Sequence, residues 1–547
     1  MQLMRDFWHS LTAIGLVVGT IFFAFSLTPS LLPRDFILQG ILSGACLTSG
    51  YAVGTILIWL WRYLELPSLP VWIARTSLRI AGVLCACIAV IFLWKFAEWQ
   101  NVTRSLMGMA PIEGGRPFEV GLIAAVVFIV LLFLGRAIRG AFTATANRLQ
   151  GLLPRRVAML AGLFIVGWAI WAAVDGLLFR VALKMADSSL QRLDTLIEPE
   201  IARPVSPLRT GGPSTLVDWE SLGRMGRAFV ATGPDTKTIS QLADSEAVEP
   251  IRIYVGLNSA KTVEERARLA LEELKRTGAF NRSVLVIITP TGTGWVDPAA
   301  MDTLEILHRG DVASVAVQYS YLLSWLSLLI EPQYGADTAR ALFNEVYDYW
   351  TALPKRQRPR LYLYGLSLGA LNSDASIDIY DVVGDPIQGA LWSGPPYSSS
   401  TWKKVTAERN QGTPAWLPSF RDGSVIRFYN QHGAAGGTYA PWGPIRIAYL
   451  QYASDPVVFF DPLASYREPA WMKQPRGPDV SPALRWFPIV TQLQIGLDMA
   501  IATSAPMGFG HVYAPEDHIV PWIEVTQPQG WTEAKLQELK AKLKSER

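Results

Sequence analysis

The chain has 547 residues, which is long enough for two or three domains, and half of these residues are hydrophobic. Its 20 tryptophans and its positive mean hydropathy make it too apolar for an ordinary cytosolic protein. The formal net charge of +3, without a Lys/Arg tract that carries interleaved aromatic residues, argues against a nucleic-acid partner. The three cysteines, Cys46, Cys85 and Cys87, lie near the N-terminus, so the rest of the chain can hold neither a disulfide framework nor a cysteine zinc site.

Five apolar segments in the N-terminal third are long enough to cross a bilayer, which requires about 20 helical residues. They cover residues 8–27, 36–61, 78–94, 120–134 and 157–178. Tryptophan and tyrosine residues lie near their ends, as amphipathic rings do at a headgroup interface. Stretches such as GLIAAVVFIVLLFLG lack the polar face that a helix of a soluble bundle would need. We therefore predict an all-α transmembrane domain of about five spans over residues 1–185.

Arginine is distributed unevenly over the links between these segments. The link before the fifth segment carries five arginines and no acidic residue, whereas the link after the first carries only Arg34, next to Asp35. Retention of cations on the cytoplasmic side predicts a cytoplasmic N-terminus, five crossings and an extracytoplasmic C-terminal portion. We interpret the first segment as an uncleaved anchor, not a signal peptide, because four further spans follow. Asp175, within the fifth segment, either pairs with Arg180 or water near the outer end or has a function of its own.

Residues 186–250 form a link that is rich in proline, glycine and charged residues, and the membrane-like pattern stops there. The link contains hydrophobic anchors that a flexible spacer would lack, namely Trp219, Leu222, Phe229 and Val230. We therefore predict an ordered segment that docks the C-terminal domain onto the membrane domain.

Strand-like and helix-like stretches alternate from residue 251 onward. IRIYVGL, SVLVIITP, VASVAVQY, RPRLYLYG, IQGALWSG and IRIAYLQY are apolar with little alternation, which is typical of strands buried on both faces of a parallel sheet. We predict an α/β domain over residues 251–531, a three-layer α/β/α sandwich with a mostly parallel sheet and its functional site at the carboxyl ends of the strands. Residues 532–547 are predicted to form an amphipathic tail helix, solvated or docked.

The pentapeptide GLSLG, from Gly365 to Gly369, lies between a predicted strand and a predicted helix. A serine at the tip of such a turn is held in a strained backbone conformation, and the flanking glycines let strand and helix pass closely. The turn presents Oγ of Ser367 to a cleft and places the Leu368 N–H at the helix N-terminus as an oxyanion donor. Ser367 is therefore predicted to be a nucleophile.

A nucleophilic serine requires a histidine base, and with this type of turn the chain order is serine, acid, histidine. Only five histidines occur, and two of them precede Ser367. We favour His511, which lies in the glycine-flanked loop MGFGHVYAP late in the domain. His432 comes before the best acid and His518 opens an apolar run, while the alternative for His511 is an ordinary surface-loop histidine.

Asp455, in YLQYASDP, follows a predicted strand and is the preferred acid. A carboxylate at a strand end can accept a hydrogen bond from the second ring nitrogen of the histidine. Asp461 is the nearest rival, and a turn residue before Pro456 is the alternative interpretation of Asp455.

Two loops bear on the remainder of the site. The second oxyanion donor is expected from the Gly/Thr loop 291–294, at Thr291 or Gly292, although a plain connecting turn explains any single residue there nearly as well. SYLLSWLSLLIEP (residues 320–332) is more apolar than a surface crossover requires. Packing on the sheet explains this as well as a hydrophobic wall that admits a lipid-like acyl chain.

With these motifs the C-terminal domain resembles an α/β-hydrolase. The whole chain resembles the bacterial membrane-anchored α/β-hydrolase family that carries its own multi-span N-terminal domain. The matching stretches are SLTPSLLPRD, STLVDWESLGRMGRAFV, PIRIYVGL, GLSLG, YLQYASDP, RWFPIVTQLQ and GFGHVY. The resemblance implies Ser367, Asp455 and His511 as the catalytic triad and a bacterial inner membrane as the location. It does not supply a substrate.

The sequence thus predicts a membrane-integrated serine hydrolase that cleaves an acyl ester, of a lipid or a lipid-linked molecule, without a metal or cofactor. Its expected partners are the substrate and membrane lipids, and the oligomeric state is left open. One alternative is an acyltransferase that uses the same triad and an acceptor other than water. A non-catalytic membrane scaffold and, more weakly, a transporter are the alternatives from other classes.

Overall fold

A computed structural model describes residues 11–67, 71–172, 194–322, 333–436 and 438–545 of the chain. Asp175 and most of the apolar stretch 320–332 lie outside these residues. The chain divides into two compact units. The first, called here the helical unit, comprises Met1–Met185 and Phe460–Ala502. The second, called the sheet unit, comprises Ala186–Phe459 and Thr503–Arg547. Residues 460–502, which the sequence assigns to the C-terminal domain, therefore group with the N-terminal helices.

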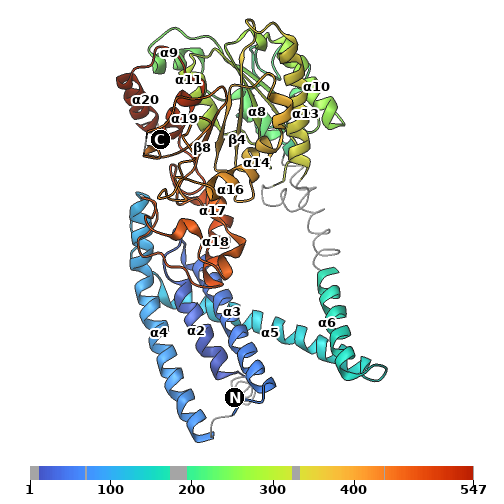
Figure 1. The fold of residues 1–547 in the computed structure, drawn as a ribbon, viewed down its shortest axis with the longest axis vertical. Coiled ribbons are helices and arrows are strands. Elements are labelled where there is room, and N and C mark those ends of the chain that lie inside the picture. The colour runs from blue at the N-terminus through green and yellow to red at the C-terminus, as the bar shows by residue number, and fades with distance from the viewer. Residues whose placement is uncertain (1–10, 68–70, 173–193, 323–332, 437, 546–547) are drawn as a thin grey trace. The chain divides into compact units, whose positions relative to one another are not determined.

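The N-terminal part of the helical unit consists of α2 (Ala13–Ser26), α3 (Phe36–Tyr63), α4 (Val71–Leu106), α5 (Pro117–Leu149) and α6 (Arg155–Trp171) (Figure 1). Within the described residues, three stretches are long and apolar enough to cross a membrane: Phe36–Tyr63, Arg79–Leu106 and Pro117–Leu149. The shorter α2 is also apolar, and the predicted fifth segment continues past residue 172 into residues that are not described. These helices indicate a membrane protein, while the number of five crossings stays a prediction.

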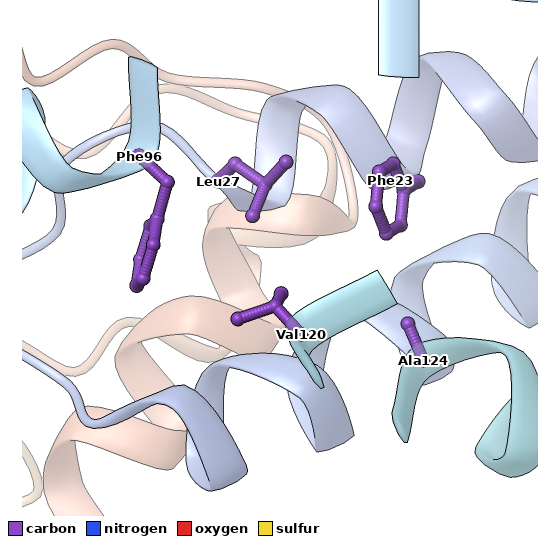
Figure 2. Packing of buried hydrophobic residues seen from close by; sticks show 5 residues of the cluster. All are labelled: Phe23, Leu27, Phe96, Val120 and Ala124. Carbon is purple, nitrogen blue, oxygen red and sulfur yellow. The ribbon is translucent and has the colours of Figure 1, made fainter. Parts of the chain in front are cut away.

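Small residues and a compact apolar cluster hold the helical unit together. A Cβ placed on Gly54 of α3 would lie 2.7 Å from the Cα of Gly15, and one on Gly50 would lie 2.8 Å from the Cα of Gly19, so α2 and α3 pack backbone against backbone. Figure 2 shows the neighbouring cluster, in which side chains from α2, α4 and α5 and from the loop after α2 face one another. Its buried members are Phe23, Leu27, Phe96, Val120 and Ala124.

The later segment of the helical unit is centred on α18 (Val490–Ala500), preceded by the 3₁₀ turns η4 (Pro462–Ser465) and η5 (Ala470–Met472). Helix α18 packs on α2 and α3. Val490 is buried against Leu42 and Cys46 of α3, and the ring of Phe487 stacks on Phe25 with 3.9 Å between the ring centroids. This apolar contact explains why the segment folds with the helices.

A buried ion pair joins α18 to the loop between α2 and α3. Oδ1 of Asp498 accepts a hydrogen bond from Arg34 Nε at 2.9 Å, and both side chains are fully buried. Oδ2 accepts from the Leu31 N–H at 3.0 Å and from the Ser30 hydroxyl. The guanidinium also donates to Gln39 at 3.1 Å. Because a buried charge is costly without its partners, the SLTPSLLPRD loop and α18 hold each other in place.

The sheet unit is built on an eight-stranded sheet with the order β1-β3-β2-β4-β5-β8-β6-β7. Its described strands are β1 (Ile251–Val255), β2 (Val284–Thr289), β3 (Val312–Val317), β4 (Arg360–Leu366), β5 (Gly389–Ser393), β6 (Ile426–Asn430), β7 (Gly433–Ala434) and β8 (Arg446–Leu450). All neighbouring pairs are parallel except β6 with the two-residue β7. Strands β1 to β5 are almost entirely buried, in agreement with their continuous apolar sequences.

Two groups of helices flank this sheet (Figure 1). One group packs on β1 to β4 and consists of α10 (Val263–Arg276), α13 (Tyr334–Ala352) and α14 (Leu368–Ala375). In the other group, α11 (Pro298–Leu307) packs on α19 (Pro515–Thr526), and α19 packs on β5 and β8. The shorter helices of the unit are α15 (Ile379–Val382), α16 (Ser400–Ala407) and α17 (Pro456–Phe459), and the tail forms α20 (Glu533–Ser545). The predicted fold, a helical region followed by a mostly parallel α/β sheet, is confirmed.

The link groups with the sheet unit, and the structure describes it from residue 194 onward. It contains η2 (Trp219–Leu222), α8 (Gly223–Ala231) and α9 (Thr236–Ala243). The four anchors identified in the sequence are buried. Helix α8 packs on β1, where Gly226 makes room for the ring of Tyr254.

The buried ion pair gives a first prediction. Replacing Arg34 by methionine leaves the Asp498 carboxylate buried without its cation, and should lower the free energy of unfolding by about 3–5 kcal/mol. The double variant Arg34→Met/Asp498→Leu should recover most of this loss, because both charges are then removed. Thermal unfolding of the detergent-purified variants measures the loss of stability and its recovery.

Arg139 is exposed on α5 and provides the matched control. Arg139→Met should stay within about 0.5 kcal/mol of the wild type. An Arg34→Met protein as stable as this control would show that the ion pair does not hold the helical unit together.

Candidate active site

Ser367 occupies a sharp turn between β4 and α14, with φ +57° and ψ −125°. A non-glycine residue is strained in this region of backbone conformation. A Cβ on Gly365 would collide with the backbone of Gly369, and a Cβ on Gly369 would collide with the Thr289 carbonyl of β2. Both glycines of GLSLG are therefore required by the close approach of strand, turn and neighbouring strand. Ser367 itself is 8% exposed.

Two backbone amides lie at the serine turn. The Ser367 N–H donates to the carbonyl of Ser393, the last residue of β5, at 2.9 Å. The Leu368 N–H is the first amide of α14 and has no partner within the helix. The positive end of the helix dipole and this amide are located beside the serine, where they can stabilise a negatively charged oxygen.

Asp455 and His511 come together in the sheet unit. Nδ1 of His511 lies 2.7 Å from Oδ2 of Asp455. The carboxylate is fully buried, and its Oδ1 accepts hydrogen bonds from the N–H groups of Val457 at 2.8 Å and Val458 at 3.4 Å. Hydrogen-bond donors therefore reach both oxygens of this buried carboxylate.

Tyr513 supplies a further hydrogen bond to this carboxylate, from its hydroxyl to Oδ2 at 2.7 Å. Burial, and secondly the nearby charge of Asp455, raise the pKa of Tyr513 well above its ordinary value, so its hydroxyl remains a donor. With an ionised acceptor at Nδ1, neutral His511 carries its proton there. Nε2 then has a free lone pair, and it is buried with no hydrogen-bond partner among the described residues.

The Ser367 backbone and the His511 ring each contact the carboxyl end of β5. Gly394 follows Ser393, the hydrogen-bond partner of Ser367, and has φ +52°. A Cβ on Gly394 would lie 2.7 Å from Cε1 of His511. The imidazole therefore packs against the residue next to the one that holds the serine backbone. Strands β4, β5 and β8 are adjacent, so the loops that carry the serine, Gly394 and Asp455 emerge at one edge of the sheet.

The loop after β2 also adjoins the serine turn, because Thr289 pairs with Gly365 in the parallel register of β2 and β4. Within this loop the Thr291 N–H donates to the Trp295 carbonyl at 2.9 Å. That amide is therefore engaged, and what Thr291 can offer a ligand is its hydroxyl, 3.3 Å from Oγ1 of Thr293. Tyr254 fixes the far side of the loop by donating to the Gly294 carbonyl at 2.7 Å.

The rival residues considered from the sequence have other contacts. Nδ1 of His518 lies 2.9 Å from the Ala514 carbonyl and Nε2 lies 3.2 Å from Oγ of Ser393. Since a carbonyl only accepts, the proton of neutral His518 is on Nδ1. Burial lowers the pKa of His518 to about 4, so this ring is neutral at pH 7. His432 lies in the turn between β6 and β7. Asp461 caps η4 in the helical unit, where it accepts from the Leu463 N–H at 2.9 Å.

A second buried carboxyl lies close to these groups. Asp297 caps α11, with Oδ1 accepting from the Ala299 N–H at 3.0 Å and Oδ2 accepting from the Tyr364 hydroxyl at 3.2 Å. Oδ2 is 3.7 Å from Nε2 of His518. Burial raises the pKa of Asp297 to about 7, and the hydrogen bonds from Ala299 and Tyr364 only partly oppose this.

Sequence reasoning missed Tyr513, Ser393 and Asp297. The signal for Tyr513 is present in GHVY, because the residue two positions after a histidine in a tight turn can bind the carboxylate that the histidine binds. The Gly508 N–H donates to the Val512 carbonyl at 2.8 Å and closes that turn. Ser393 and Asp297 carry no comparable local signal, because their roles depend on which strands are neighbours.

Two family models match the chain. One, described as "Alpha/beta-hydrolase family", matches residues 251–539. The other, described as "Alpha/beta-hydrolase family N-terminus", matches residues 27–234. The first alone covers more than half of the chain. No curated protein and no solved structure matches the chain.

The buried pair predicts a pH dependence of stability. The pKa of His518 is lowered from 6.5 to about 4 and that of Asp297 is raised from 3.8 to about 7. Between about pH 4 and 6.5 the folded state binds one proton, on Asp297, and the unfolded state also binds one proton, on His518. Because the two states bind equal numbers of protons, this pair makes the free energy of unfolding of the wild type independent of pH over that range. In Asp297→Asn only the contribution of His518 is left, and it is lost as pH falls from 6.5 to about 4.

Asp297→Asn should therefore lose stability relative to the wild type by about 1 kcal/mol per pH unit over this acidic range. Chemical denaturation of both proteins at several pH values measures the difference. Parallel pH dependences would contradict the assignment of the proton to Asp297.

Proposed function

The chain belongs to the α/β-hydrolase family, and we propose that it is a membrane-integrated serine hydrolase that cleaves acyl esters. The observation that carries this proposal is the His511 ring, which is bonded through Nδ1 to the buried Asp455 and has an unpaired Nε2 at the strand edge that presents Ser367. Such an arrangement suits removal of a proton from a serine hydroxyl.

In the proposed reaction, Oγ of Ser367 forms a bond to the ester carbonyl carbon while its proton moves to Nε2 of His511. The Asp455 carboxylate stabilises the resulting imidazolium and fixes the ring. The tetrahedral intermediate collapses when the carbon–oxygen bond to the alcohol breaks, and the alcohol leaves with the proton from Nε2. Water then gives a proton to Nε2 and attacks the acyl-serine. Release of the acid returns that proton to Oγ and restores the enzyme.

The negative oxygen of the intermediate needs donors that are already oriented. We assign one to the Leu368 N–H, at the start of α14. The second is assigned to the Thr291–Gly292 part of the loop after β2. Since the Thr291 amide is engaged with Trp295, the donor from Thr291 in this proposal is its hydroxyl.

The proposed substrate is the ester of a lipid or a lipid-linked molecule. Three helices able to span a membrane belong to the same chain, and they would confine the enzyme to a surface where such esters are concentrated. The arginine-rich link before the fifth apolar segment supports a bacterial inner membrane with the sheet unit on the extracytoplasmic side.

A fluorophosphonate probe tests the nucleophile directly. The wild-type protein in native membranes should be labelled, Ser367→Ala should not be, and Ser245→Ala, at an exposed serine of the link, should behave as the wild type. His511→Ala and Asp455→Asn should be labelled roughly 1,000-fold more slowly or worse, because they remove the base or reverse its tautomer. A wild type that resists the probe while folded would remove the basis for a serine hydrolase.

Product analysis then identifies the acceptor of the acyl group. Release of free acid from an acyl ester in the presence of lipid or sugar alcohols supports hydrolysis. Quantitative transfer of the acyl group to such an alcohol would identify an acyltransferase instead.

The orientation has its own test. Alkaline phosphatase fused after residue 547 should be active in a bacterial host, since this enzyme folds only outside the cytoplasm. The same reporter fused within the arginine-rich link, after residue 150, should be inactive. The reverse pattern would place the sheet unit in the cytoplasm.

A further inference from the structure

Four polar side chains are buried together behind the serine turn. Asp297, Tyr364, Ser393 and His518 come from the loop after β2, from β4, from β5 and from α19. Tyr364 donates to Asp297 at 3.2 Å. Oγ of Ser393 lies 3.2 Å from Nε2 of His518. The mechanism proposed above uses none of these four side chains.

Each member is attached to a part of the site. Asp297 ends the loop that begins beside the serine turn, and Tyr364 precedes Ser367 on β4 by three residues. The backbone carbonyl of Ser393 accepts the Ser367 N–H. His518 holds the Ala514 carbonyl, shortly after the His511 turn. Two hydrogen-bonded pairs, Tyr364 with Asp297 and Ser393 with His518, thus link β4 to the loop after β2 and β5 to the helix that follows the histidine turn.

The protonation state of this set follows from its contacts. His518 carries its proton on Nδ1, toward Ala514, so Nε2 accepts from the Ser393 hydroxyl. A neutral ring and a protonated carboxyl are favoured here, because an ion pair would require two charges to be buried, and 3.7 Å separate the atoms that would have to bond. The other charged or titratable groups that act on Asp297 are Asp302 and His511. Burial, and then the Asp297 carboxyl, raise the pKa of Tyr364 well above its ordinary value, so its hydroxyl stays protonated.

We propose that Asp297, Tyr364, Ser393 and His518 are positioning residues that hold the serine turn in register with the loop after β2 and the histidine turn. This inference rests on the proposed function. A hydrogen-bonded set that is fully buried resists small displacements, because each displaced group would be left unsatisfied in the interior. Catalytic geometry is sensitive to such displacements, and a shift of about 1 Å can reduce a rate roughly 100-fold.

Tyr364→Phe is the most direct test, because it removes one hydroxyl and keeps the ring, which packs on Trp522 with 5.7 Å between centroids. Tyr449→Phe on β8 is the matched control. Tyr449 is also a fully buried strand tyrosine, but its hydroxyl has no hydrogen-bond partner among the described residues. The readouts are the rate of fluorophosphonate labelling and, with an ester substrate, kcat and KM. Ser367→Ala serves as the blank.

The proposal expects Tyr364→Phe to be labelled roughly 10- to 100-fold more slowly than the wild type, with kcat reduced and KM unchanged. Tyr449→Phe should retain the wild-type rate. Asp297→Asn resembles the neutral acid and should therefore be labelled several-fold faster at pH 6 than Asp297→Ala. The asparagine variant also keeps the test valid if the alanine variant folds poorly.

If the wild type is labelled and Tyr364→Phe and both Asp297 variants keep its rate, the positioning role is wrong while the serine hydrolase stands. Equal losses in Tyr364→Phe and Tyr449→Phe would also overturn it, since the hydrogen bond would then be irrelevant. An unlabelled wild type would overturn both this inference and the proposed function.

Discussion

The hydrogen bond between the Asp455 carboxylate and Nδ1 of His511 is the interaction on which the candidate site depends. It fixes the ring and leaves the opposite nitrogen without a proton. The first amides of α17 and the Tyr513 hydroxyl also bind this buried carboxylate, so that both of its oxygens have hydrogen-bond donors. In the proposed mechanism, this buried and fully hydrogen-bonded carboxylate is what makes a loop histidine a competent base.

The parallel sheet brings the parts of this arrangement together. Strands β2, β4, β5 and β8 are consecutive neighbours, so the loops at their carboxyl ends meet at one edge although the chain segments are far apart. The serine turn depends on the same packing. Gly369 is required because the backbone of β2 lies against the start of α14, and Gly365 is required because the Gly369 backbone lies against it in turn. These contacts hold the strained serine in place.

The sequence is sufficient for the features that depend on local chemistry. Continuous apolar runs identify buried strands, and GLSLG between a strand and a helix identifies the turn at Ser367. The pairing of Asp455 with His511 agrees with a chain-order rule. Features that depend on tertiary contacts are not accessible in this way. Nothing local shows that the Thr291 amide would be bonded to Trp295, or that α18 would fold with the N-terminal helices. The latter depends on Arg34 meeting Asp498, more than 400 residues away in the chain.

The segment Phe460–Ala502 belongs to the helical unit, yet it lies in the chain between Asp455 and His511. The polypeptide therefore passes between the two units three times, near residues 186, 460 and 503. A single proteolytic cut in the link would leave two covalent connections intact. Release of the sheet unit from the helical unit by proteolysis would require three separate cleavages, two of them within sixty residues of Asp455. The path of the chain therefore ties the sheet unit to the helical unit at three separate points.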